Sequence, residues 1–134
     1  MPVVKTDEMP IQSPSDIVMA RQAVRSIAAS MGFSLVDQTK IVTAASELAR
    51  NTLDYGGGGV LRLVHIEENP RKGLQLVFED HGPGIPDVQL ALKDGYTTGG
   101  GLGLGLGGAR RLVNDFDIAS APGQGTRVTI TRWR

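Results

Sequence analysis

Two polar side chains that could take part in catalysis, Glu47 and Asn51, stand four residues apart in a segment typical of a helix. Residues at this spacing lie on one helix face, about one turn from each other. A carboxylate can accept a proton, and a carboxamide oxygen is a hard ligand that suits Mg²⁺. The pair is therefore a candidate base beside a candidate metal ligand. A solvated polar face near the helix end is the alternative, because such pairs are common on helices.

A second group of candidate residues follows a hydrophobic segment of strand character. Asp80 is succeeded by Gly82 and Gly84, at alternate positions. Bare backbone at such glycines can receive a flat heterocycle, and the carboxylate could accept a hydrogen bond from an exocyclic amine such as that of adenine. A tight loop in which Asp80 forms an Asx-turn would account for the same residues without a ligand.

A third feature is the glycine-rich tract over residues 97–108, TTGGGLGLGLGG. Glycines let backbone N–H groups approach a polyphosphate, and a helix that follows would direct its positive end towards it. The three spaced leucines argue against a plain flexible linker. The tract matches neither GxxxxGK[ST] nor a glycine fingerprint in a βαβ unit. We therefore expect a mobile, partly anchored lid over phosphates.

The fourth feature is the run Gly123-Gln124-Gly125-Thr126, which precedes the last predicted strand. The Thr126 hydroxyl could share a water or a hydrogen bond with a base held near Asp80. Taken alone, the run indicates only a hairpin turn.

Hydrophobic periodicity and turn residues predict the elements that position these groups. The expected elements are an edge strand over 3–6, a helix capped by Ser13 or Ser15 and running to Met31, a helix over 37–55, strands over 60–66 and 74–78, a short helix over 86–92, a helix over 109–114, and strands over 116–121 and 126–133. Hairpins dominate this order, so we predict an α/β two-layer sandwich. Its sheet should be mixed or largely antiparallel, with the helices on one face. A single domain should span residues 1–134.

The composition limits the classes of function. The chain has 134 residues, 40% of them hydrophobic, and a formal net charge of +0, so nothing indicates electrostatic capture of nucleic acid or of an anionic membrane. It has no cysteine, which is typical of a reducing compartment and excludes disulfide scaffolds. No apolar run approaches bilayer length, and the first residues lack the apolar core of a signal peptide. We therefore predict a cytoplasmic protein.

The order and spacing of the four motifs carry more information than any motif alone. ExxxN on a helix, DxGxG after a strand, GLGLGLG before a helix and GxGT before the last strand resemble the N, G1, G2 and G3 boxes of the GHKL (Bergerat-fold) superfamily of ATPases and kinases. The resemblance covers the chain from about Gln38 to its end. Three longer segments are similar to RsbT-type serine/threonine switch kinases: residues 16–51, 72–87 and 94–118.

The resemblance implies ATP and Mg²⁺ as cofactors and assigns roles to the motif residues. Asn51 would hold the Mg²⁺ that bridges the phosphates, and Asp80 would bind the adenine amine, with Thr126 supporting the base. Glu47 would take the proton of an incoming serine hydroxyl. The other nucleotide-binding residues implied are Gly82, Gly84 and Ile85 at the adenine, and Thr98, Gly99, Gly100, Gly101, Leu102, Gly103, Leu104 and Gly105 over the phosphates.

The resemblance also implies protein partners. An RsbT-type kinase would phosphorylate a STAS-domain antagonist or scaffold (RsbS-like or RsbR-like) in a stressosome pathway. It would then bind and activate a PPM-type phosphatase (RsbU-like). For Arg50, Lys93 and Arg110 three roles stay open, namely phosphate contact, partner contact and plain surface charge, of which surface charge is favoured.

Other classes of protein share some of these features. An anti-sigma factor of the RsbW or SpoIIAB type carries the same boxes and would sequester a sigma factor. A nucleotide-gated adaptor without phosphotransfer would be expected to lack the carboxylate at position 47. A histidine kinase needs a phosphorylated histidine on a dimerisation helix, whereas His65 lies in a predicted strand and His81 in the DxGxG loop.

Overall fold

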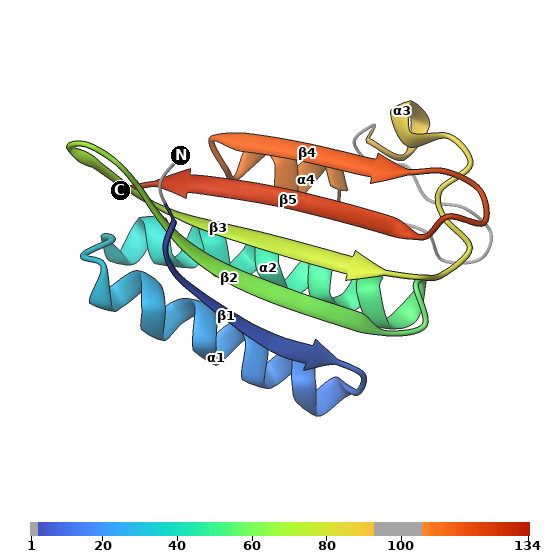
Figure 1. Ribbon diagram of the computed structural model, residues 1–134, viewed down its shortest axis with the longest axis horizontal. Helices are drawn as coiled ribbons and strands as arrows, with labels where there is room; N and C mark the ends of the chain where they lie inside the picture. Colours follow the sequence, from blue (N-terminus) through green and yellow to red (C-terminus); the bar gives the residue numbers. More distant parts are fainter. Residues whose placement is uncertain (1–2, 93–105) are drawn as a thin grey trace.

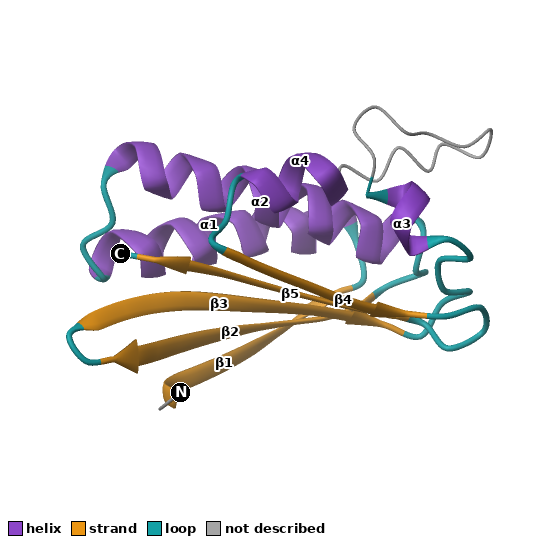
Figure 2. Cartoon of the chain, turned by 90° about the horizontal axis from the view of Figure 1, so that it is seen from above, coloured by secondary structure: helices purple, strands orange, loops and turns teal. Residues whose placement is uncertain are grey.

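The chain forms one layer of strands and one layer of helices, seen face-on in Figure 1 and edge-on in Figure 2. This computed structural model describes residues 3–92 and 106–134. Along the chain the elements are β1 (Val3–Ile11), α1 (Pro14–Ser30), α2 (Leu35–Asp54), β2 (Gly59–Glu68), β3 (Arg71–Asp80), α3 (Val88–Ala91), α4 (Leu106–Arg111), β4 (Asp115–Ser120) and β5 (Thr126–Trp133). The strands lie in the order β1-β2-β3-β5-β4, and every neighbouring pair is antiparallel.

The predicted two-layer architecture is confirmed. Helices α1, α2 and α4 lie on one face of the sheet, and α3 lies near one end of it (Figure 2). One face of α2 is buried, at Ile41, Ala45, Leu48 and Thr52. These side chains pack on the helix-facing side of the strands, where Leu61, Leu76, Phe78 and Ile130 are also fully buried. The core therefore sits between α2 and the middle three strands.

Several predicted boundaries were wrong. The first strand was predicted to end at Thr6, but β1 pairs with β2 as far as Ile11, and Pro10 is tolerated because β1 is an edge strand. The helix predicted over 109–114 is α4, which starts within the glycine tract and ends at Arg111. Helix α2 begins at Leu35, earlier than predicted, because the Ser34 side chain caps it by accepting from the Asp37 N–H at 3.1 Å.

No helix within residues 3–92 and 106–134 is long and apolar enough to cross a membrane.

The strand register brings several motif residues into one row at one end of the sheet. Gly59 at the start of β2 pairs with Asp80 at the end of β3, which pairs with Thr126 at the start of β5. Thr126 in turn pairs with Ser120 at the end of β4. Residues spread from position 59 to position 126 thus lie in one row across four strands.

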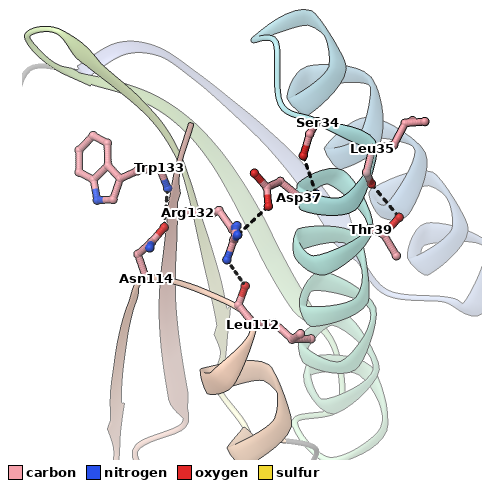
Figure 3. A network of polar contacts seen from close by, with 8 residues as sticks. All are labelled: Ser34, Leu35, Asp37, Thr39, Leu112, Asn114, Arg132 and Trp133. Carbon is pink, nitrogen blue, oxygen red and sulfur yellow. Dashed lines mark hydrogen bonds and ion pairs between the residues drawn. The ribbon is translucent and has the colours of Figure 1, made fainter.

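Arg132, at the opposite end of β5 from Thr126, links this strand to the start of α2 and to the residue that follows α4 (Figure 3). It alternates along β5 with the buried Val128 and Ile130, so it lies on the helix-facing side of the strand. Its Nη2 donates to Asp37 Oδ1 at 2.7 Å, and its Nη1 donates to the carbonyl of Leu112 at 3.0 Å, directly after α4. The pair is partly buried, with 16% of the Arg132 side chain and 31% of the Asp37 side chain exposed. The hydrogen bond from Arg132 is the main cause that lowers the pKa of Asp37.

Replacing Asp37 with Asn should destabilise the fold in a pH-dependent way. A carboxyl whose pKa is lower in the folded state stabilises the fold above its unfolded pKa, and this contribution is lost as the pH falls through the folded pKa. We expect Asp37→Asn to cost about 1 kcal/mol at pH 6, discounted for partial exposure, and progressively less at a second, acidic pH well below the ordinary carboxyl value of 3.8. Urea unfolding at the two pH values measures this. Asp117→Asn, on the exposed side of β4, is the control, and an Asp37→Asn cost that stays equal at both pH values would contradict the account.

Candidate functional site

The C-terminal half of α2 presents both polar residues of the first motif. Asn51 is partly buried and lines a cavity between α2 and the ends of β3 and β5. Glu47 lies one turn earlier, and its Oε1 is 3.5 Å from Nη1 of Arg50. That ion pair is largely exposed, with 37% of the Glu47 side chain and 55% of the Arg50 side chain accessible, so it contributes little to stability. The pairing gives Arg50 a contact that the sequence did not predict.

Asp80 is a buried carboxyl at the last residue of β3, with 7% of its surface exposed. Its Oδ1 accepts a hydrogen bond from the Gly82 N–H at 2.9 Å. Burial raises the pKa of Asp80, and the backbone N–H groups of Gly82 and Thr126 oppose this rise only in part. A carboxylate whose lost hydration is only partly replaced by backbone hydrogen bonds is suited to accept a further donor from a ligand.

Gly56, directly after α2, lets the chain approach this carboxyl. A Cβ at position 56 would stand 2.3 Å from Cγ of Asp80, which no side chain could tolerate. The absence of a side chain at Gly56 therefore makes room for Asp80. Any larger residue at position 56 would displace the carboxyl from the cavity.

The DxGxG loop is held to both α2 and the β4–β5 turn. Gly84 has a φ of +77°, and a Cβ there would lie 1.9 Å from the carbonyl oxygen of Ala121. Its own carbonyl accepts a hydrogen bond from the Tyr55 hydroxyl at 2.7 Å. The loop is thus fixed between the last turn of α2 and the turn that follows β4.

Ser120 connects the second and fourth motifs. Its Oγ accepts from the Ile85 N–H at 2.8 Å and donates to the carbonyl of Gly125 at 3.1 Å. A hydroxyl has one proton, so in the contact with Thr126 Oγ1 at 2.8 Å it is Thr126 that donates. Thr126 then retains acceptor capacity on the side of the cavity that it shares with Asp80.

The structure brings four of the predicted site residues to one cavity. Asn51, Asp80, Ile85 and Thr126 all line it, together with apolar side chains that belong to the core: Leu48, Phe78, Leu106 and Val128. Its volume is about 20 Å³, far below the roughly 300–1,000 Å³ of small-molecule sites. A base could enter only if lining side chains moved apart.

The remaining predicted residues stand apart from this cavity or outside the described part of the chain. Glu47 is not among the lining residues, although it lies on the same helix as Asn51. Gly82 and Gly84 form the loop at the cavity's edge rather than its wall. The predicted phosphate lid, Thr98 to Gly105, lies outside the described residues, as does Lys93.

Sequence reasoning missed three residues that organise the site: Tyr55, Gly56 and Ser120. Tyr55 and Gly56 follow Asn51 within five positions, so their place at the end of the motif-bearing helix was a usable signal. Ser120 had no such signal, because its role depends on the pairing of β4 with β5.

Comparisons with known proteins agree with this geometry. Residues 36–133 match the family of histidine kinase-, DNA gyrase B- and HSP90-like ATPases. The chain is 45% identical over 123 residues to the serine/threonine-protein kinase RsbT of Bacillus subtilis (strain 168), covering 92% of each chain. It is 27% identical over 119 residues to an anti-sigma F factor of Thermoanaerobacter sp. (strain X514), covering 85% of this chain and 82% of the relative.

A solved structure also shares the fold. A crystal structure of the RsbU and RsbW domains of a Mycobacterium tuberculosis protein superposes with a TM-score of 0.64 at 18% identity. The match covers 98% of this chain but only 33% of that one. The predicted superfamily and the predicted RsbT-type kinase are both confirmed. The chain belongs to the family of histidine kinase-, DNA gyrase B- and HSP90-like ATPases, and within it is a homologue of the serine/threonine-protein kinase RsbT.

Proposed function

We propose that this serine/threonine kinase transfers the γ-phosphoryl group of Mg·ATP to a serine of a STAS-domain protein in the cytoplasm. The observation that carries the proposal is the meeting of Asn51, Asp80 and Thr126 at one cavity at the end of the sheet. These residues come from three separate motifs, and each has the chemistry that one part of a nucleotide requires. The 45% identity to RsbT supports the choice of substrate class.

The adenine would bind where the Asp80 carboxyl is buried. Its exocyclic amine would donate to Asp80, replacing part of the solvation that burial removes. Thr126 would support the base edge as an acceptor, directly or through a water. Since the cavity holds only about 20 Å³, base binding would move side chains at its wall, and Ile85 and Leu106 are the apolar candidates.

The residues present fit a Mg²⁺ that arrives with the nucleotide. Within residues 3–92 and 106–134, no three His, Cys, Asp or Glu side chains gather to hold a metal on their own. Mg²⁺ commonly takes one or two protein oxygens and fills its remaining positions with phosphates and water. Asn51, with its carboxamide at the cavity, would supply such an oxygen. When bound, the ion would neutralise charge on the phosphates.

Glu47 would act as the base for the incoming serine. As the serine Oγ forms its bond to the γ-phosphorus, the bond from phosphorus to the bridging β,γ-oxygen breaks and ADP leaves. The serine proton would pass to the Glu47 carboxylate, one helical turn from Asn51. The ion pair with Arg50 is exposed, so Glu47 can exchange it for the substrate hydroxyl at little cost.

After transfer, the kinase would leave its STAS partner and bind a PPM-type phosphatase.

The similarity to anti-sigma F factors, at 27% identity, supports a second candidate function, sequestration of a sigma factor. Co-purification with a sigma factor rather than with STAS and phosphatase partners would favour that candidate.

Removing the proposed base should impair transfer without impairing nucleotide binding. We expect Glu47→Gln to lower the rate of phosphorylation of a STAS protein by roughly 10²–10⁴-fold, the usual contribution of a general base. The measurement uses ATP labelled on the γ-phosphate and a STAS antagonist from the same genome. ATP affinity should change little, because Glu47 does not line the cavity. Glu68→Gln, an exposed change in the β2–β3 hairpin, is the matched control, and full activity of Glu47→Gln would remove Glu47 from the mechanism.

Replacing Asp80 with Asn should weaken ATP binding while leaving the fold intact. Asn keeps an oxygen for the Gly82 N–H but presents no carboxylate to the adenine amine. A hydrogen bond to a charged group contributes about 1.5–3 kcal/mol, so we expect a loss of roughly 10–150-fold in ATP affinity by calorimetry.

The stability of the same variant provides the control. Because burial raises the pKa of Asp80, the ionised carboxyl costs stability once the pH exceeds the folded pKa. Asp80→Asn should therefore unfold at the same temperature as the parent at pH 7, or at a higher one. Weak ATP binding together with a large loss of stability would show that Asp80 is a structural residue.

A further inference from the structure

A second cavity lies at the other end of the sheet from Asp80. It is bounded by the last turns of α1 and by the helix-facing side of β1, β2 and β3, and its volume is about 310 Å³. Its floor and walls include apolar side chains of the core: Ile27, Met31, Leu63 and Leu74. Leu74 and Asp80 are six residues apart on β3, so the two cavities are separated by roughly 20 Å.

The mouth of this cavity is cationic. Lys5, Lys72 and Arg134 line it against a single carboxylate, Asp7. Lys5 Nζ lies 3.7 Å from Asp7 Oδ2, which leaves two positive side chains without an acidic partner in the lining. The Arg134 guanidinium is held in place because its Nη1 donates to the carbonyl of Met31 at 3.2 Å. Among the side chains that line the cavity, cationic groups outnumber carboxylates three to one, and Glu67, outside the lining, pairs in register with Lys72.

The cavity also contains a buried polar atom that has no partner. His65 lies on the helix-facing side of β2, paired in register with Lys5 on one side and Leu74 on the other. Its Nε2 is buried and makes no hydrogen bond to any residue that the structure describes. Buried ring nitrogens are nearly always satisfied, so this atom calls for a partner. The proposed kinase mechanism makes no use of His65.

We propose that this cavity binds a small organic anion, a carboxylate carried on a short apolar body. The apolar part would lie against Met31, Leu63 and Leu74. The carboxylate would accept from His65 Nε2 and pair with Lys72 and Arg134. The volume lies at the lower end of the roughly 300–1,000 Å³ of small-molecule sites, which fits a ligand smaller than a nucleotide. This site does not depend on the proposed kinase mechanism.

Titrating the ¹⁵N-labelled full chain with hexanoate tests the proposal, with hexanamide as the neutral control of the same shape. We expect saturable shifts at the amides of Gly32, His65 and Leu74, with a dissociation constant of about 1 mM or tighter, and at least tenfold weaker binding of hexanamide. The amide of Gly82, beside Asp80, should not shift. Absence of saturable shifts, or equal binding of hexanamide, would overturn the proposal.

Substitutions distinguish a site that binds an anion through His65 from a cavity in which His65 has only a structural role. Lys72→Gln combined with Arg134→Gln should weaken hexanoate binding by about tenfold or more, whereas Arg25→Gln, an exposed change on α1 outside the cavity, should not. His65→Phe keeps a ring of similar shape and should also reduce hexanoate affinity while ATP binding persists. If His65→Phe left hexanoate affinity unchanged, the proposed hydrogen bond would be wrong and the assignment of this site would fail.

Discussion

The structure of the site depends on the burial of one carboxyl group, that of Asp80. An acidic side chain placed at the end of a central strand, within the hydrophobic layer, loses much of its hydration, and its raised pKa reports that loss. Two backbone N–H groups compensate for part of the cost. A ligand that brings a hydrogen-bond donor could offset the remaining free-energy cost of desolvation. Such a site lowers the stability of the protein without ligand and raises its affinity for the ligand, which is common where side chains are arranged for binding.

Two features of the fold make that burial possible, and a third holds the helices to the sheet. The antiparallel register sets Gly59, Asp80, Thr126 and Ser120 side by side at one end of the sheet. Gly56 permits the end of α2 to close over the carboxyl without a clash. Arg132 joins β5 to the first turn of α2 and to the residue after α4, so the helical layer is anchored to the same strand that begins with Thr126. The site is therefore a product of sheet register and helix placement together.

The sequence predicted the architecture and four of the residues that line the cavity, for identifiable physical reasons. The buried stripe of α2 and the alternation of β5 follow from periodicity, and Asn51, Asp80 and Thr126 sit in motifs with fixed spacing. The contacts of Tyr55 with Gly84, of Ser120 with Ile85 and of Arg132 with Asp37 could not be predicted, since each joins residues distant in sequence. The extension of β1 to Ile11 was missed because Pro10 normally ends a strand, and only its edge position makes it acceptable. Glu47 and the tract over 98–105 remain predictions.

The central claim, that Asp80 binds the adenine amine, is tested most directly by changing the ligand. Purine riboside triphosphate lacks that amine and otherwise matches ATP, so its affinity isolates one hydrogen bond. Calorimetry on the unmodified chain should show it binding roughly 10-fold or more weakly than ATP, in line with a hydrogen bond to a charged group. In Asp80→Asn the two nucleotides should bind within a few-fold of each other. Equal affinities for the unmodified chain would contradict the claim and place the base elsewhere.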